Sequence, residues 1–156
     1  MQLTRAADYA VRVMIHLASP AAEGRVSLPV LARAAGAPES FLSKVLQALS
    51  RARLVSSRRG QTGGFQISPR GRAASMRQVI EAIDGAICLN VCTVPARSCR
   101  RSAWCPAHPV WVQAQQAMLD VLGKVTVSEL AAQLAPTHTD DAPLAGPPEN
   151  SIALSQ

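Results

Sequence analysis

Apolar residues recur at helical spacing near the start of the chain. Between residues 4 and 18 they stand three or four positions apart, which predicts a helix with an apolar side formed by Ala7, Val11, Met14, Ile15 and Ala18. Thr4 is suited to cap the first turn of this helix, and Pro20 prevents it from continuing. The first element is therefore an amphipathic helix.

Two shorter helices follow. One is predicted over residues 28–35, because Ser27 precedes it and Gly36 ends it. The next begins with Pro38 as a first-turn proline and runs to about residue 53. Two short helices joined by a glycine-containing turn are typical of a helix-turn-helix.

The last of these helices has two distinct sides. Its apolar side consists of Leu42, Val45, Leu46, Leu49 and Ala52. Its polar side, which contains no acidic residue, consists of Ser40, Ser43, Lys44, Gln47 and Arg51. Such side chains suit hydrogen bonds to base edges and phosphates, so this helix is predicted to read double-stranded DNA.

A basic β-hairpin is predicted directly after these helices. Its strands are expected at residues 54–57 and 64–68, with a glycine-rich tip between them and Arg58 and Arg59 at the base of the tip. A hairpin in this position is a wing, and its arginines are suited to the negative potential of the minor groove. The alternative is a solvated surface turn.

The second half of the chain predicts helices around a loop. A helix is expected over residues 75–84, and a loop then extends to Pro109. A longer helix follows over residues 110–122, with an apolar side formed by Val110, Ala114, Ala117, Met118, Val121 and Leu122. A short final helix is expected near residues 127–134.

The predicted fold class is mainly α with a small β-hairpin: a winged helix-turn-helix plus a long dimerisation helix. The expected units are a DNA-binding domain over residues 1–74 and a cysteine-loop sensor and dimerisation region over residues 75–134. The tail from 135 to 156 is predicted to be disordered, because residues 136–156 hold four prolines, three acidic residues and no Lys or Arg. We assign the tail no function.

Charge is divided unevenly between the two halves. Residues 1–75 carry 11 Lys and Arg against 3 Asp and Glu, whereas residues 76–156 carry 5 against 7, for a net charge of +6. This division favours a polyanion as partner of the first half, although Arg-rich composition alone would also produce it. Aromatic residues make up 3% of the chain, which argues against stacking of single-stranded bases.

The sequence shows no feature of an exported or membrane protein. No apolar run approaches the roughly 18–20 residues that a membrane span needs, and the first residues do not resemble a secretory signal. A cytoplasmic location without membrane contact is therefore expected. No phosphate-binding loop or catalytic Ser/His/Asp set is evident, so we expect no enzyme and no catalytic residue.

All four cysteines lie close together, at Cys88, Cys92, Cys99 and Cys105. Disulfides are disfavoured in a reducing cytosol, and clustered cysteines there more often serve metal or redox chemistry. Cys88 has three readings: a small buried hydrophobe, a spare ligand or a redox partner.

The order of these pieces resembles the Rrf-two family of winged-helix transcriptional regulators, with its IscR and NsrR types. The resemblance covers residues 1–134 and is carried by LTRAADYAVRVMIHLA, PESFLSKVLQALSRARLVSSRRGQTGGFQIS, the VIEAIDG helix and the cysteine loop with CPAHPVW. It implies a homodimer formed through the long helix, bound to a roughly palindromic promoter site. Many members hold an iron–sulfur cluster on three cysteines of each subunit, and others use no metal.

The resemblance implies Cys92, Cys99 and Cys105 as ligands of a 2Fe–2S or 4Fe–4S cluster. Six residues separate the first two cysteines, where the family usually has five. The fourth ligand has two candidates: His108, three positions after Cys105 as in the IscR type, or Asp8 of the partner subunit as in the NsrR type. Each residue also has an interpretation without a metal. His108 could be hydrogen-bonded to water, and Asp8 could be a solvated first-turn carboxylate that the helix dipole favours.

Other chemistries remain open for the loop. Structural zinc is less favoured, because it usually uses closely paired cysteines that are absent among these three. A metal-free thiol sensor is a further alternative. The predicted function is a regulator, expected to repress, that senses redox, nitric oxide or iron status; the alternatives are a metal-free or zinc-bound regulator and an iron–sulfur electron carrier.

Overall fold

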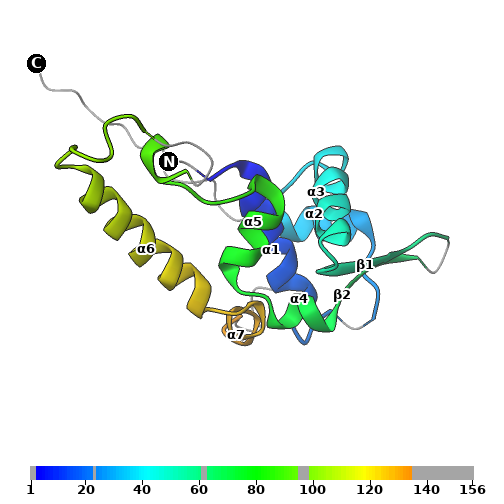
Figure 1. Cartoon of the computed structure of the whole chain (residues 1–156). Helices are drawn as coiled ribbons and strands as arrows, with labels where there is room; N and C mark the ends of the chain where they lie inside the picture. The colour runs from blue at the N-terminus through cyan, green and yellow to red at the C-terminus, as the bar shows by residue number, and fades with distance from the viewer. Residues whose placement is uncertain (1–2, 23, 61–62, 95–98, 135–156) are drawn as a thin grey trace, which may run out of the picture.

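The computed structural model describes residues 3–22, 24–60, 63–94 and 99–134, and Figure 1 shows the arrangement of its elements. The first half holds α1 (Arg5–Ala18), α2 (Leu28–Ala35), α3 (Glu39–Arg51), β1 (Val55–Arg58), β2 (Gly64–Ile67) and α4 (Pro69–Ala73). The second half holds α5 (Met76–Asp84), the 3₁₀ helix η1 (Val91–Thr93), α6 (His108–Lys124) and α7 (Val127–Ala132). The fold is mainly α with one small β-hairpin, as predicted. The tail predicted to be disordered lies outside the described residues.

Helix α1 lies at the centre of the molecule. It packs against α2, α3, α5 and α7, and Figure 1 shows it between the hairpin on one side and α6 on the other. The Thr4 hydroxyl caps the helix by accepting a hydrogen bond from the Ala7 amide at 3.2 Å. One core cluster joins the buried side of α1 to the other helices and includes Val13, Met14, Leu17, Leu31, Leu42, Leu46, Leu49, Val79 and Val127.

Local chemistry sets the boundaries of α2 and α3. Gly36 ends α2 in the left-handed region with φ 65°. Pro38 is the N-cap of α3 and not its first helical residue, which corrects the predicted start. The helix ends at Arg51 and not near residue 53, because Arg53 adopts φ 60° and closes a Schellman motif in which the Leu54 amide donates to the Leu49 carbonyl at 3.0 Å.

The hairpin is shifted slightly from its predicted position. β1 and β2 pair antiparallel from Val55↔Ile67 to Arg58↔Gly64, so Arg58 belongs to the strand and not to the tip. Val26, ahead of α2, forms an isolated bridge to Phe65 of β2, with both amide–carbonyl distances at 2.8 Å. This bridge fixes the orientation of the hairpin relative to the helix-turn-helix.

Helix α6 stands at the side of the molecule opposite the hairpin (Figure 1). It begins at His108 and ends at Lys124, so it is longer than the predicted 110–122. Met118, Leu119 and Leu122 pack against a small cluster that contains Ile80 of α5 and Ile87. None of its residues is fully buried. Within the described ranges, none of the helices combines the length and apolar character that crossing a bilayer requires.

Candidate nucleic-acid interface and cysteine loop

Helix α3 presents the polar face that the sequence predicts. Leu42, Val45, Leu46 and Leu49 are buried on one side, and Ala52 is half-buried just beyond the helix end. On the other side Ser43 is half-buried, and the exposed predicted residues are Ser40, Lys44, Gln47 and Arg51. Burial of the apolar side fixes this rotation of the helix, so these polar groups lie on the surface as one face.

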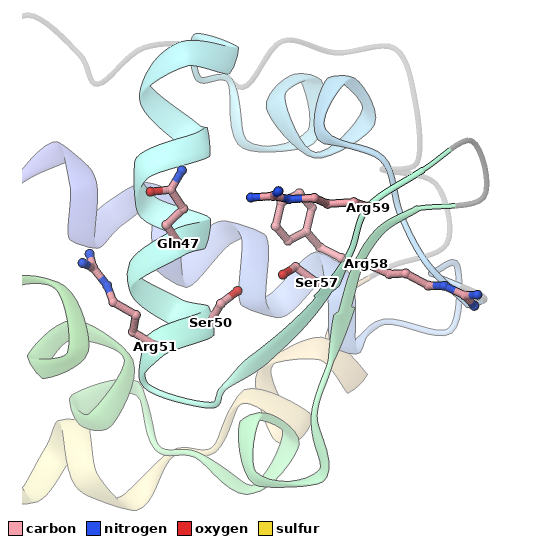
Figure 2. A pocket seen from close by; sticks show the side chains of 7 residues that line it. Gln47, Ser50, Arg51, Ser57, Arg58 and Arg59 are labelled. Carbon is pink, nitrogen blue, oxygen red and sulfur yellow. The ribbon is translucent and has the colours of Figure 1, made fainter.

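A groove separates the second half of α3 from the hairpin. It has a volume of about 480 Å³ and is lined by Gln47, Ser50, Arg51, Ser57, Arg58, Arg59 and Phe65. Figure 2 shows that Ser50 of α3 and Ser57 and Arg59 of the hairpin point into the space between the two elements, whereas the guanidinium groups of Arg51 and Arg58 extend away from it. The structure therefore brings four of the seven predicted DNA-binding residues together, whereas Ser40, Ser43 and Lys44 lie nearer the start of α3.

Three of the groove residues were not predicted from the sequence: Ser50, Ser57 and Phe65. The sequence spacing could have indicated two of them, Ser50 and Ser57. Ser50 follows Gln47 by three positions, which places it on a neighbouring side of the same helix. Ser57 precedes Arg59 by two positions, which places both on one face of an extended strand.

The groove is positively charged. Arg51, Arg58 and Arg59 contribute to its walls, and no carboxylate is among the lining residues. Ion pairs in the described part of the chain involve other residues, Arg12 with Asp8 and Arg77 with Glu81. The arginines of the groove are therefore available to a polyanion, whose phosphates supply most of the affinity in nucleic-acid binding.

The first part of the cysteine loop is attached to α6. The side chain of Gln115 accepts a hydrogen bond from the Leu89 amide at 2.9 Å and donates one to the Thr93 carbonyl at 3.5 Å. Asn90 caps η1 by accepting from the Val91 amide at 2.7 Å. These bonds position Cys92 beside the long helix.

The second part of the loop consists of successive turns. The Cys105 amide donates to the Arg101 carbonyl at 2.8 Å, and the His108 amide donates to the Cys105 carbonyl at 3.1 Å. Cys105 and His108 thus share one turn at the start of α6. Nδ1 of His108 is buried and has no hydrogen-bond partner in the described part of the chain.

The donor atoms of the loop fit an iron–sulfur cluster in their chemistry. All four cysteines are free and half-buried, and His108 adds an uncommitted imidazole nitrogen. Across residues 3–22, 24–60, 63–94 and 99–134, no three His, Cys, Asp or Glu side chains are gathered around one metal position. Asp8, the other predicted fourth ligand, is on α1 and forms an ion pair with Arg12 at 2.8 Å.

The sequence model of the Rrf2 family, described as an iron-dependent transcriptional regulator, matches residues 3–133. The chain belongs to the Rrf2 family. The predicted resemblance to this family is therefore confirmed, and it spans the helix-turn-helix, the hairpin, the cysteine loop and the long helix.

Known Rrf2 proteins resemble the chain over most of its length. A putative HTH-type transcriptional regulator, ORF2 of Azotobacter vinelandii, is 32% identical over 133 residues, which cover 85% of this chain and 80% of that protein. The structure of T. potens IscR has a TM-score of 0.69 at 22% identity and covers 91% and 94% of the two chains. CymR, the global cysteine regulator of B. subtilis, has a TM-score of 0.69 at 23% identity and covers 86% and 99%.

These comparisons establish the functional class. The chain is a transcriptional regulator of the Rrf2 family, and the named relatives are regulators and not enzymes. The neighbours below 25% identity show that the fold is the Rrf2 winged helix. The groove between α3 and the hairpin therefore lies between the recognition helix and the wing of a DNA-binding fold.

Proposed function

We propose that this Rrf2 protein is a cytoplasmic homodimer that represses transcription by binding a palindromic promoter site in double-stranded DNA, and that an iron–sulfur cluster controls this binding. The observation that carries the sensing part is the buried, unpartnered Nδ1 of His108, one turn from Cys105 in a loop of free cysteines. A buried polar atom without a partner costs stability, and an imidazole nitrogen bound to iron would remove that cost.

Cys92, Cys99, Cys105 and His108 are the residues that would hold the cluster. His108 is preferred over Asp8 of the partner subunit because the Asp8 carboxylate already binds Arg12, whereas the imidazole nitrogen has no partner among the described residues. When bound, the cluster supplies iron that reacts with oxidants and nitric oxide and is lost when iron is scarce. Gln115 and the turn from Cys105 to His108 keep the two parts of the loop attached to α6.

The dimer is proposed to form through the outer side of α6. Val110 and Val121 are 64% and 65% exposed, and they lie about three helical turns apart on one face with Ala114 and Ala117 between them. A second copy that covers this face makes the same contacts in return, which gives a two-fold dimer. Two recognition helices related by a two-fold axis match two half-sites of a palindrome.

The inner side of α6 connects the loop to the DNA-binding helices. Met118 and Leu122 pack against the cluster around Ile80 of α5, and α5 packs against α1. A change at the cysteine loop that moves α6 therefore displaces surfaces that also support α1. We propose this packed chain of helices as the route by which the state of the cluster alters DNA affinity.

The test is anaerobic purification with a visible absorption spectrum and metal analysis. Thiolate-bound iron should make the protein brown, and Cys92→Ala, Cys99→Ala or Cys105→Ala should each remove the colour, because each variant leaves an iron without a strong anionic ligand. Cys88→Ala is the matched control, because Cys88 is half-buried like the other three cysteines, and the Cys88→Ala protein should remain brown. A colourless protein with stoichiometric zinc, or with no metal, would contradict the cluster and leave the DNA-binding function intact.

A further inference from the structure

The hydroxyl of Ser50 is buried in the groove wall without a partner. A serine within a helix commonly donates to the carbonyl one turn earlier, yet Oγ of Ser50 has almost no exposed surface and forms no hydrogen bond to any described residue. The position lines the groove between α3 and the hairpin. A buried hydroxyl without a hydrogen-bond partner lowers the stability of the folded protein in the absence of ligand. A ligand with acceptor atoms in the groove would restore the missing hydrogen bond.

The hairpin places a second hydroxyl and a charge on the opposite wall. Side chains alternate along a strand, so Ser57 and Arg59 share one face while Ser56 and Arg58 share the other. In Figure 2 the Ser57 hydroxyl points toward that of Ser50, the Arg59 guanidinium extends toward α3, and that of Arg58 points away. The Ser56 hydroxyl donates to the Gln66 carbonyl at 3.4 Å and is therefore satisfied within the hairpin.

We propose that this groove holds a backbone phosphate of the bound DNA, with Ser57 donating a hydrogen bond to its oxygens, Ser50 donating a second one once the side chains that cover its hydroxyl move aside, and Arg59 supplying the opposite charge. A phosphodiester offers acceptors and a negative charge but no donor, which matches a wall of hydroxyls and arginines without a carboxylate. The volume of about 480 Å³ leaves room for the adjoining sugar, and the Phe65 ring provides an apolar surface for it. The proposal rests on the DNA-binding function and specifies where the backbone is held.

The consequence is that the groove fixes the register of the duplex between the wing and the recognition helix. Phosphate contacts position a protein on DNA without reading its sequence. Loss of the Ser50 or Ser57 hydroxyl should therefore weaken binding to random-sequence DNA as much as binding to the specific site. Loss of the Lys44 or Gln47 side chain should weaken mainly the binding to the specific site.

The test uses a fluorescent random-sequence duplex of about 30 base pairs, long enough for two half-sites one helical turn apart. Ser50→Ala and Ser57→Ala should each weaken binding about tenfold, because each removes a hydrogen bond to a charged group, and should leave the salt dependence unchanged. Arg59→Gln should weaken binding and lower the salt slope by about one phosphate contact. Ser56→Ala is the matched control on the same strand and should bind like the wild type.

Thermal unfolding without DNA gives a second readout. Ser50→Ala should raise the melting temperature of the free protein, because it removes a buried hydroxyl that has no partner. A residue that only supports the fold would instead lower the melting temperature when truncated. If Ser50→Ala is more stable than the wild type and binds DNA more weakly, the Ser50 hydroxyl serves ligand binding and not the fold.

Several results would overturn the proposal, and each differs from a failure of the DNA-binding function. Unchanged affinity in Ser50→Ala and Ser57→Ala, with Arg59→Gln weakened, would show that the hydroxyls do not touch the backbone. A lower melting temperature for Ser50→Ala would show that the hydroxyl serves the fold. Inorganic phosphate that stabilises the wild type but not Ser50→Ala, with duplex affinity equal in both, would assign the groove to a small anion. A wild-type protein that binds no duplex at all would contradict the DNA-binding function itself.

Discussion

The guanidinium of Arg12 lies 2.8 Å from the carboxylate of Asp8, one turn earlier on α1. Another nitrogen of the same guanidinium donates to the Ala35 carbonyl at 3.3 Å, at the end of α2. Arg12 therefore connects Asp8 to the turn between the two helices of the helix-turn-helix. Ligation of a cluster in the partner subunit by Asp8 would therefore compete with this ion pair.

This relationship predicts the outcome of replacing the two candidate fourth ligands. Asp8→Ala should leave anaerobically purified protein brown and should cost at most about 0.5 kcal/mol of stability, because the ion pair is solvent-exposed. His108→Ala should shift or weaken the visible absorption, because water replaces one ligand. If Asp8→Ala bleaches the protein and His108→Ala does not, the fourth ligand comes from the other subunit.

Base recognition is predicted to depend on the exposed face of α3. Lys44→Ala or Gln47→Ala should weaken binding to the specific promoter site by about 1–3 kcal/mol for each lost base contact, with a smaller effect on random DNA. Equilibrium titrations with both duplexes measure the ratio. Equal losses on the two duplexes would mean that these side chains contact the backbone and not the bases.

The dimer is predicted to depend on Val121. Val121→Asp places a charge on the proposed interface and should produce monomers with weak DNA binding, because a single half-site binds poorly. Val112→Asp is the matched control: the same change on the same helix, about two and a half turns away and therefore on the opposite face. Sedimentation should show a dimer for this control, and a dimer for Val121→Asp as well would place the interface elsewhere.

Helix α4 is predicted to have no room for a side chain at Gly71. A Cβ at this position would collide with the Leu54 carbonyl oxygen. Gly71→Ala should therefore reduce the free energy of unfolding by about 3 kcal/mol. Gly123→Ala, on α6 with nothing within 4 Å of the added Cβ, should instead stabilise by about 0.5–1 kcal/mol. Chemical denaturation compares both variants with the wild type.

The cap of α7 predicts a pH dependence in acid. Hydrogen bonds from the backbone amide and then the hydroxyl of Thr126 hold the pKa of Glu129 below its ordinary value. A lowered folded-state pKa gives stability that is present above the ordinary glutamate pKa and is lost as pH falls through the folded value. Glu129→Gln keeps a capping side chain without the charge. The stability difference between wild type and variant should therefore shrink on acidification, and a constant difference would contradict this account.

The predictions from sequence succeeded where a local signal was sufficient. Thr4 and Gly36 mark helix ends that the structure confirms, because caps act within one turn of the chain. Helix α4 was missed because a five-residue element containing a glycine has no detectable period. Ser68 followed by Pro69 was its available signal, and the Ser68 hydroxyl does accept a bond from the Gly71 amide.

Tertiary contacts decided what the sequence could not. The sequence predicts a single apolar side for α6, yet Met118 and Leu122 pack within the chain while Val110 and Val121 remain exposed. A periodic pattern does not reveal which neighbour covers each position. The groove at Ser50 and Ser57 depends on the crossing of a helix and a strand, so residue types alone do not predict it.

The last helix completes the core that the first helix begins. Val127 and Ala131 of α7 are buried in the same cluster as Ala10 and Val13 of α1. During synthesis the chain emerges from its N-terminus, so this core stays open until the cysteine loop and α6 have also left the ribosome. A shortened transcript that encodes only the helix-turn-helix and the hairpin therefore yields a chain with an unfinished core. Such a fragment should be less stable than the whole chain, because the apolar side of α1 that packs against Val127 and Ala131 would be exposed to water.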